Sequence, residues 1–185
     1  MGRGTAVPDA EEAGESAKRD IGGYACGLTN PSINVQGDDD WIAESATPGY
    51  RWRRMRIAGE KLGASLYELE PGERTFPYHY ELGNEELLLV VEGRPTLREP
   101  DGERELSPGD CVLFPSGPDG AHEVVNRTDE PVRVLIASNF TVPRGAVQVD
   151  SGKIMIRWGT EPDESLWFRR DDAAGYWDGV PRADE

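Results

Sequence analysis

Between residues 50 and 140, short apolar segments alternate with turn residues at fairly regular intervals, and this pattern limits the possible folds more than any other feature. Proline and glycine end strands, because proline lacks a backbone donor and glycine adopts positive φ. No segment here repeats its apolar residues every ~3.6 positions, so we expect helices to be minor. The pattern predicts an all-β fold, a sandwich or barrel. The expected strands are 51–57, 64–70, 76–81, 86–92, 95–99, 104–106, 111–115, 123–126 and 132–140.

The expected strand 86–92 reads ELLLVVE and is apolar on both of its alternating faces. A strand of this kind is covered on both sides. The barrel interior would cover one face, and a second sheet, the tails or a partner subunit would cover the other. With the aromatic C-terminal residues, this strand leads us to predict a homodimer.

The length of 185 residues fits one domain with long tails. Residues 1–40 are acidic and poor in large apolar side chains, so we expect a disordered or loosely draped tail. Residues 41–140 form the expected barrel domain. Residues 141–185 form an extension with strand candidates at 153–158 and 166–169. Three of the five tryptophans lie after residue 150, so we expect this extension to pack on the barrel.

Charge and composition exclude several functions. The formal net charge is −15, and binding to a phosphate backbone needs clustered lysine and arginine, so we expect no nucleic-acid partner. No apolar run approaches the ~20 residues that span a bilayer, and no secretory apolar segment is present. We therefore expect a soluble, cytoplasmic protein without a membrane partner. Cys26 and Cys111 lack metal or redox spacing and are expected to be reduced thiols, with Cys111 buried as a small hydrophobe.

Several arginines are weak candidates for binding anions. The one basic cluster, RWRRMR at 51–56, is interpreted as an exposed strand edge protected by charge, and an anion site is the alternative. Arg98 and Arg133 are candidates for anchoring a substrate carboxylate, although exposed arginines on barrel strands are common.

The only two histidines, His79 and His122, lie beside turns at the mouths of expected strands. Residues i and i+2 of a strand face the same side, so His79 and Glu81 project together. A hairpin through 82–85 can bring Glu86 alongside them, and His122 would supply a second imidazole. Two imidazoles with one or two carboxylates suit Fe(II), Mn(II), Zn(II) or Ni(II). Two histidines and one carboxylate with open positions are typical of non-haem iron oxygenases.

The surroundings of both histidines resemble the two motifs of a small single-domain cupin. The first family motif is a glycine, H-x-H, a glutamate and a second glycine; the corresponding residues are Gly72, His79, Glu81, Glu86 and Gly93, with one extra residue after Gly72. The second motif is G, P-x-G, H and N; the corresponding residues are Gly109, Pro115, Gly117, His122 and Asn126, with two extra residues before the histidine. The resemblance covers roughly residues 60–140. It implies a double-stranded β-helix, or jelly-roll barrel, whose inward H-x-H, glutamate and later histidine hold one divalent metal.

One departure from the family pattern leaves the ligand set open, because Glu81 stands where the second histidine belongs. If Glu81 ligates, the added negative charge favours Mn(II) or Fe(II). If Glu81 does not reach, Tyr78 or Tyr80 could line the site, and the metal could be weak or absent. Both tyrosines are also candidate general acids or stacking residues, although strand aromatics usually pack.

The remaining choices concern the other carboxylate and the histidines themselves. Either Glu85 or Glu86 could be the ligand; the six residues before Gly93 favour Glu86, and Glu85 would point the opposite way. The alternative to a metal site is that both histidines are ordinary polar residues at strand ends.

Two classes of function follow from the resemblance, and whether the protein is an enzyme stays open. The first is a metal-dependent enzyme on a small organic substrate, with His79, Glu86 and His122 as ligands and Glu81 as fourth ligand or base. Dioxygenase chemistry and isomerisation or epimerisation of a sugar-like substrate are the reactions to test first. The second is a non-catalytic module that binds a small ligand, such as a sugar, with any metal structural.

Overall fold

The computed structural model describes residues 32–38, 41–139, 141–159 and 164–181. These residues form strands and two short 3₁₀ helices, with no α-helix among them, so the all-β prediction is confirmed. The strands are β1 (Ala43–Ser45), β2 (Trp52–Ala58), β3 (Leu62–Leu69), β4 (His79–Leu82), β5 (Glu86–Glu92), β6 (Thr96–Glu99), β7 (Gly102–Glu105), β8 (Cys111–Phe114), β9 (Glu123–Val125), β10 (Val132–Asn139), β11 (Arg144–Gln148), β12 (Lys153–Arg157) and β13 (Ser165–Arg169). The 3₁₀ helices are η1 (Pro118–Gly120) and η2 (Arg170–Asp172).

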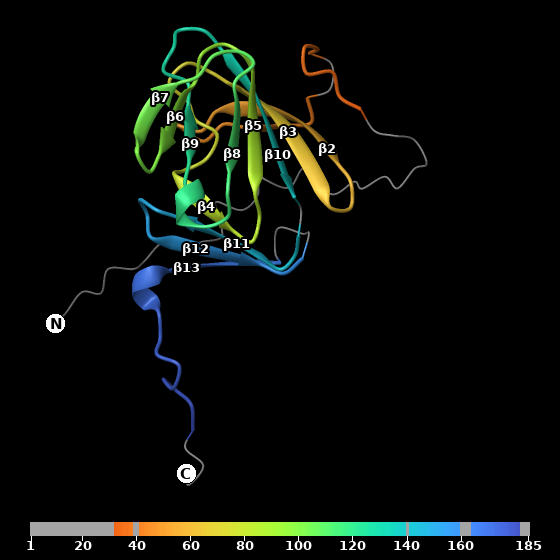
Figure 1. The fold of residues 1–185 in the computed structure, drawn as a ribbon. Helices are drawn as coiled ribbons and strands as arrows, with labels where there is room; N and C mark the ends of the chain where they lie inside the picture. The colour runs from red at the N-terminus through yellow and green to blue at the C-terminus, as the bar shows by residue number, and fades with distance from the viewer. Residues whose placement is uncertain (1–31, 39–40, 140, 160–163, 182–185) are drawn as a thin grey trace, which may run out of the picture.

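The strands build three antiparallel sheets around one barrel (Figure 1). The six-stranded sheet has the order β1-β2-β3-β10-β5-β8, the four-stranded sheet β13-β12-β11-β4, and the three-stranded sheet β7-β6-β9. In Figure 1 the four-stranded sheet lies across the lower end of the barrel. Strands far apart in sequence are neighbours, as in the pairing of β10 with both β3 and β5. This is the predicted jelly-roll barrel, a double-stranded β-helix.

Alternation along the strands fills the barrel. Glu86, Leu88 and Val90 of β5 share the inward face, and Leu88 and Val90 are buried in the core with Val134 of β10. Each such fully buried side chain contributes about 1.5–3 kcal/mol. The outward face of β5 is less well covered, since Leu87 remains 40% exposed. Because Glu86 lies in register with these core residues, the packing of β5 aims its carboxylate into the barrel.

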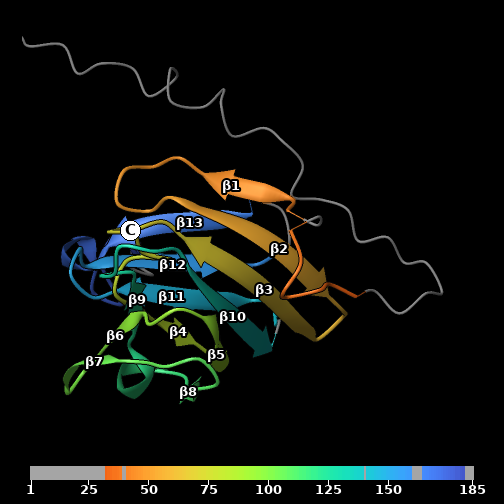
Figure 2. The same cartoon turned by 90° about the horizontal axis from the view of Figure 1, so that it is seen from above.

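The structure corrects the interpretation of the basic cluster at 51–56. We interpreted this segment as an exposed edge strand, but β1 pairs with β2 outside it, so β2 is not an edge (Figure 2). Two strands, β1 and β11, lie outside the strands expected from the sequence. Cys111 was expected to be buried, yet it lies on the outward face of β8 and is exposed. Cys26 falls outside the described residues.

Arg98 and Arg133 are both held by carboxylates of the protein itself. Arg98 donates two hydrogen bonds to Asp150, at 2.7 and 2.9 Å. The Arg133 Nε donates to Glu68 at 2.8 Å, and its Nη2 donates to Asp38 at 2.6 Å. Their guanidinium groups are therefore engaged in ion pairs away from the barrel cavity.

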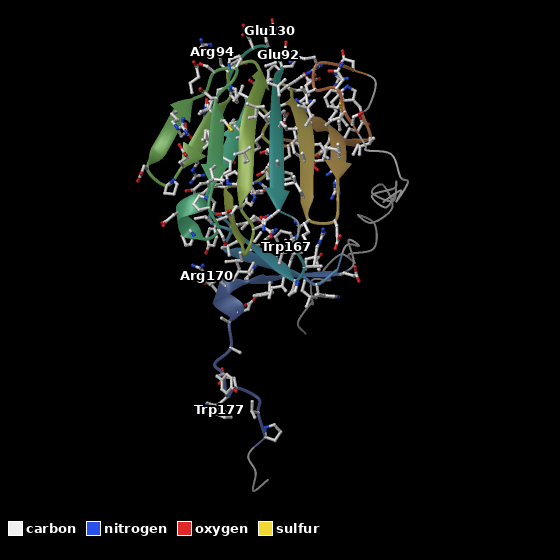
Figure 3. All side chains as sticks on the ribbon, turned by 45° about the vertical axis from the view of Figure 1, so that its right-hand side comes forward. Glu92, Arg94, Glu130, Trp167, Arg170 and Trp177 are labelled. Atoms are coloured by element: carbon white, nitrogen blue, oxygen red, sulfur yellow. The ribbon has the colours of Figure 1, made fainter. Side chains whose placement is uncertain are left out.

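The ends of the chain differ in how much of them is described. Residues 1–31 and 39–40 lie outside the described residues, so the disorder expected of the N-terminal tail stays a prediction. After Asn139, β11 pairs with β4, and β12 and β13 continue that sheet. Figure 3 shows Trp167 on this sheet and Trp177 on the segment that leads away from the barrel. Across the described residues, no helix has the length and apolar character needed to cross a bilayer.

Gly93 ends β5 in a turn that only glycine accommodates well. Its φ is +78°, and a Cβ there would lie 2.5 Å from Val132 Cγ1, at the start of the central strand β10. Gly109 also has a positive φ, +92°, but a Cβ there would meet nothing within 4 Å. A side chain at Gly109 would therefore add only backbone strain, whereas a side chain at Gly93 would add backbone strain and a steric clash.

We expect Gly93→Ala to lower the free energy of unfolding by about 3–4 kcal/mol, because the strained φ and the clash with Val132 add. Gly109→Ala, the control, should cost only about 1–2 kcal/mol, the cost of the strained φ alone. Urea denaturation measures both. Equal losses in the two variants would contradict the packing role of Gly93.

Candidate metal centre

Two backbone hydrogen bonds join the strand that carries His79 to the segment that carries His122. The His79 N–H donates to the His122 carbonyl at 3.2 Å, and the His122 N–H donates to the His79 carbonyl at 2.8 Å. The two rings consequently lie side by side, with centroids 4.8 Å apart. His79 is the first residue of β4, and His122 directly precedes β9. Residues 43 positions apart in sequence are thus fixed as neighbours by the main chain.

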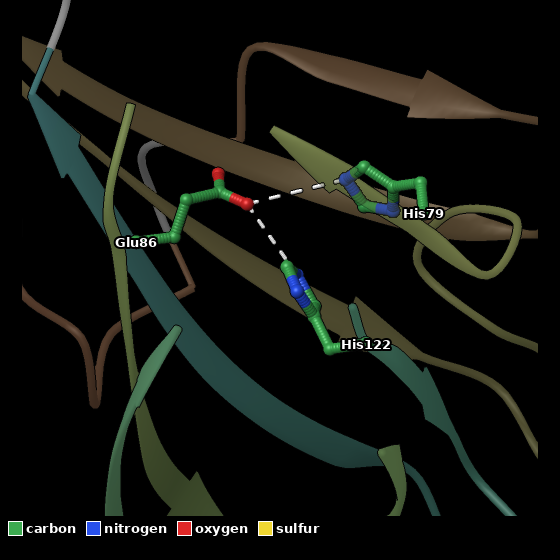
Figure 4. A group of neighbouring side chains, drawn as sticks. All are labelled: His79, Glu86 and His122. Atoms are coloured by element: carbon green, nitrogen blue, oxygen red, sulfur yellow. Dashed lines mark ion pairs between the residues drawn. The ribbon is translucent and has the colours of Figure 1, made fainter. Parts of the chain in front are cut away.

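Glu86 reaches the same point from the next strand. The connection between β4 and β5 is held where the Gly83 N–H donates to Ser116 Oγ at 2.8 Å and the Glu85 N–H donates to Asn139 Oδ1 at 2.7 Å. Glu86 Oε2 lies 3.4 Å from His122 Nε2 and 4.0 Å from His79 Nε2 (Figure 4). One ligand atom from each of the three residues lies within 4.8 Å of the other two.

Each imidazole is oriented by a hydrogen bond on its far side. His79 Nδ1 lies 2.8 Å from the Pro77 carbonyl oxygen, and His122 Nδ1 lies 2.9 Å from the Gly120 carbonyl oxygen. A carbonyl can only accept, so each Nδ1 carries the proton and each neutral ring presents the Nε2 lone pair to Glu86. Phe114 stacks on the His122 ring at 3.7 Å, with 6° between the planes, and fixes its tilt. Such outer contacts orient histidine ligands in metal proteins.

Burial sets the protonation of the cluster. It lowers the pKa of His79, and burial together with the adjacent His79 ring lowers the pKa of His122 to about 3. Burial and the charge of Glu81 raise the pKa of Glu86 to about 7. Both imidazoles are therefore neutral at neutral pH, the state in which nitrogen binds a metal.

The donor set fits a divalent cation. Two Nε2 lone pairs and a carboxylate oxygen face one another, and they repel unless a proton or a metal ion lies among them. Two nitrogens and one oxygen match the preferences of Zn(II), Fe(II), Mn(II) and Ni(II). Three protein ligands also leave coordination positions for a substrate.

A cavity of about 390 Å³ adjoins the three side chains. Phe76 and Trp167 supply aromatic surface in its wall. Its charged lining, apart from the cluster itself, consists of Glu81, Arg54, Arg56, Arg144 and Arg157. Arg144 and Arg157 were not expected from the sequence, because only the pairing of β11 with β12 brings them together. The inward direction of Arg54 and Arg56 could have been predicted from the sequence. Both share one face of a strand with Trp52, and this tryptophan packs inward.

The family model of the cupin domain matches residues 65–138, the part of the barrel that holds all three side chains. The barrel is a cupin domain. This confirms the family that the two motifs indicated.

Two solved structures share the cupin fold over most of this chain. A sugar phosphate isomerase of the cupin superfamily from Silicibacter pomeroyi is 26% identical, with a TM-score of 0.65 over 80% of this chain and 98% of that one. A proposed sugar phosphate isomerase from Acidithiobacillus ferrooxidans is 20% identical, with a TM-score of 0.66 over 78% and 95%. At that identity the second likeness shows the fold alone. A search of curated proteins finds no match.

Within this cupin domain, Glu81 lies apart from the three clustered residues. It lines the cavity, but it is not among the side chains whose ligand atoms lie close together. Its Oε2 is buried without a hydrogen-bond partner in the described structure, and burial raises its pKa, opposed by Arg144 and Arg157. The position held by a histidine in the family motif is therefore occupied here by an acid that faces the cavity and the arginines.

The other candidates of the sequence analysis lie outside the cavity. Tyr78 points to the opposite side of β4 and packs beneath the Arg98 guanidinium at 3.9 Å. The Tyr80 hydroxyl accepts a long hydrogen bond, 3.5 Å, from Arg170. Neither ring lines the cavity. Glu85 is exposed and turned away, which leaves Glu86 as the carboxylate beside the histidines.

Proposed function

We propose that this cupin is a metal-dependent isomerase that acts on a small sugar-like substrate. The observation that carries the proposal is the convergence of His79, Glu86 and His122 on one point of an arginine-lined cavity. The 26% identity to a cupin described as a sugar phosphate isomerase, over most of both chains, supports the reaction class. The volume of about 390 Å³ suits a small ligand, since pockets for such ligands span ~300–1,000 Å³.

In this proposal, the three clustered side chains hold the metal and Glu81 moves the proton. His79, Glu86 and His122 would hold a divalent ion, which would supply Lewis acidity to polarise the substrate carbonyl. Isomerisation then moves a carbon-bound hydrogen from the hydroxyl-bearing carbon to the neighbouring carbonyl carbon, and the hydroxyl proton to the former carbonyl oxygen. Glu81 suits the transfer between carbons because its unpartnered Oε2 faces the cavity, with no backbone donor to compete for it.

One observation favours a second reaction class. Two histidines and one carboxylate are the ligand pattern of non-haem iron oxygenases, so a dioxygenase is the runner-up. The non-catalytic binding module stays the third possibility. The activity assay described below separates the three.

We expect protein purified without chelator to contain a divalent metal, measured by plasma mass spectrometry. Glu86→Gln and His122→Ala should each lower metal affinity by at least about 100-fold, because losing even an outer partner of a ligand costs ~10–100-fold. Glu85→Gln, one residue away and facing solvent, is the matched control and should bind metal like the wild type. Unchanged metal content in Glu86→Gln, or no metal affinity in the wild type, would refute the metal site.

For the activity, we expect the metal-loaded protein to convert one member of a panel of aldose and ketose phosphates, followed by nuclear magnetic resonance. Glu81→Gln should keep the metal and lower kcat by about 10²–10⁴-fold, the usual contribution of a general base. Oxygen consumption that depends on the substrate would point to the dioxygenase instead. Binding without turnover would point to the binding module.

We also propose a homodimer formed through the outward face of β5 and β8. Leu87 and Leu113 are directly paired there and are 40% and 59% exposed. Light scattering should give twice the chain mass of 20.4 kDa, and Leu113→Arg should shift it toward the monomer. A monomeric mass for the wild type at micromolar concentration would contradict the dimer.

A further inference from the structure

Four arginines from three strands face one cavity. Arg54 and Arg56 stand two residues apart on β2, so both point to the same side of the six-stranded sheet. Arg144 of β11 and Arg157 of β12 reach the cavity from the four-stranded sheet. The two sheets thus bring like charges together from opposite walls.

The register of the strands places two of these arginines side by side. Arg144 and Arg157 are directly opposite each other on adjacent antiparallel strands. Like charges at such positions are destabilising. Burial, followed by the charges of Arg144 and Arg56, lowers the pKa of Arg157, although Glu81 and Glu164 oppose this. Three of the four guanidinium groups are therefore close enough to repel one another.

Some donor capacity in this cluster is unused within the protein. The Nε atoms of Arg54 and Arg157 are buried, and among the described residues neither has a hydrogen-bond partner. Arg74, which does not line this cavity, also has a buried Nε without a partner among the described residues, but its Nη1 donates to Glu123 at 2.8 Å. Buried guanidinium donors that lack a partner are the expected state of an anion site before its ligand arrives.

The charge of the cavity is opposite to that of the chain. The whole sequence carries −15, whereas the cavity lining holds four arginines against Glu81 and Glu86, with both histidines neutral. Even with both glutamates ionised, the lining is positive by two charges, the difference between four cations and two anions. A metal ion would add to this excess, so the site favours a ligand that carries two negative charges.

We propose that Arg54, Arg56, Arg144 and Arg157 bind the phosphate group of a phosphate monoester, while the other end of the same molecule lies against Glu81 and the metal cluster. This inference deepens the proposed function, and the contact of the ligand with Glu81 and the metal cluster rests on that proposed function. A phosphate monoester carries about −1.5 to −2 charges at neutral pH and three acceptor oxygens, so it can satisfy several guanidinium groups at once. A carboxylate has one charge and two oxygens, and one bidentate arginine already satisfies it.

The position of Glu81 connects the two ends of the cavity. Glu81 of β4 pairs with Ala146 of β11, two residues from Arg144, and it lines the same cavity as Arg144 and Arg157. Glu81 is also two residues from His79 on β4, so both side chains are on the face of the strand that lines the cavity. A short phosphorylated molecule anchored by the arginines would therefore pass over the Glu81 carboxylate before reaching the histidines.

The test measures binding of inorganic phosphate to the full chain by isothermal titration calorimetry. We expect the wild type to bind phosphate with a Kd of about 1 mM or tighter, and acetate at equal ionic strength more weakly. Arg157→Gln and Arg54→Gln should each weaken phosphate binding by about tenfold or more, the usual value of a charged hydrogen bond. Arg157→Lys keeps the charge but not the planar guanidinium group, so its phosphate affinity should lie between those of the wild type and Arg157→Gln.

Two controls separate this inference from the proposed function. Arg94→Gln removes an exposed arginine paired with Glu105 and should leave phosphate binding unchanged. His122→Ala removes a proposed metal ligand but no arginine, so it should still bind phosphate even when metal is lost. A wild type that binds phosphate but no metal would contradict the proposed metal site alone, and a wild type that binds metal but no phosphate would contradict this inference alone.

Thermal unfolding distinguishes a ligand site from a structural role of Arg157. In phosphate-free buffer, Arg157→Gln should melt at a higher temperature than the wild type, because the repulsion with Arg144 is relieved. Added phosphate should raise the Tm of the wild type by more than that of the variant. No phosphate binding by the wild type at about 10 mM would overturn the inference. So would a lower Tm of Arg157→Gln with unchanged phosphate binding.

Discussion

The reciprocal backbone hydrogen bonds between His79 and His122 are the constraint on which the rest of the site depends. They join the first residue of β4 to the segment before β9, and so connect the four-stranded sheet to the three-stranded sheet. Because the main chain sets the separation of the rings, the side chains need little freedom of their own. The hydrogen bond from each Nδ1 to a carbonyl oxygen restricts the rotation of each imidazole ring. Glu86 then completes the group because the alternation of β5, fixed by Leu88 and Val90 in the core, points it inward.

The cavity has two chemically different ends, and the charges of the chain are distributed to keep them so. Near the histidines, burial keeps the imidazoles neutral and holds the pKa of Glu86 near neutrality, which favours a cation. Near β2, β11 and β12 the guanidinium groups favour an anion. Glu81 lines the same cavity as the histidines and the arginines, and it interacts electrostatically with Glu86 and with two of the arginines. A substrate with a carbonyl and hydroxyl groups at one end and a dianion at the other is complementary to this division.

The expected strands agree well with the structure where side-chain alternation is strong. The segment 86–92 matches β5 residue for residue, and β10 begins at the expected residue 132 and runs to Asn139, after which residue 140 lies outside the described residues. The failures occur where a strand is defined by its neighbours. Gly145 in β11 looks like a turn residue, but a Cβ there would lie 2.9 Å from the Met155 carbonyl oxygen, so the glycine permits close pairing with β12. The prediction that Cys111 is buried was wrong, because the sequence of a four-residue strand does not show which face points inward until its pairing with β5 is known.

The candidate site shows the same division between local and distant information. By itself the sequence determined that this is an all-β barrel of the cupin type and that His79, Glu86 and His122 are its candidate ligands, because glycine turns, strand alternation and motif spacing act within a few residues. Only the tertiary structure decided that Tyr78 and Tyr80 do not line the cavity, that Glu81 stands apart from the ligand cluster, and that arginines of β2, β11 and β12 line the same cavity as that cluster. These facts depend on which strands pair and in which register. Register is set by the packing of the whole barrel, which no local pattern of residues contains.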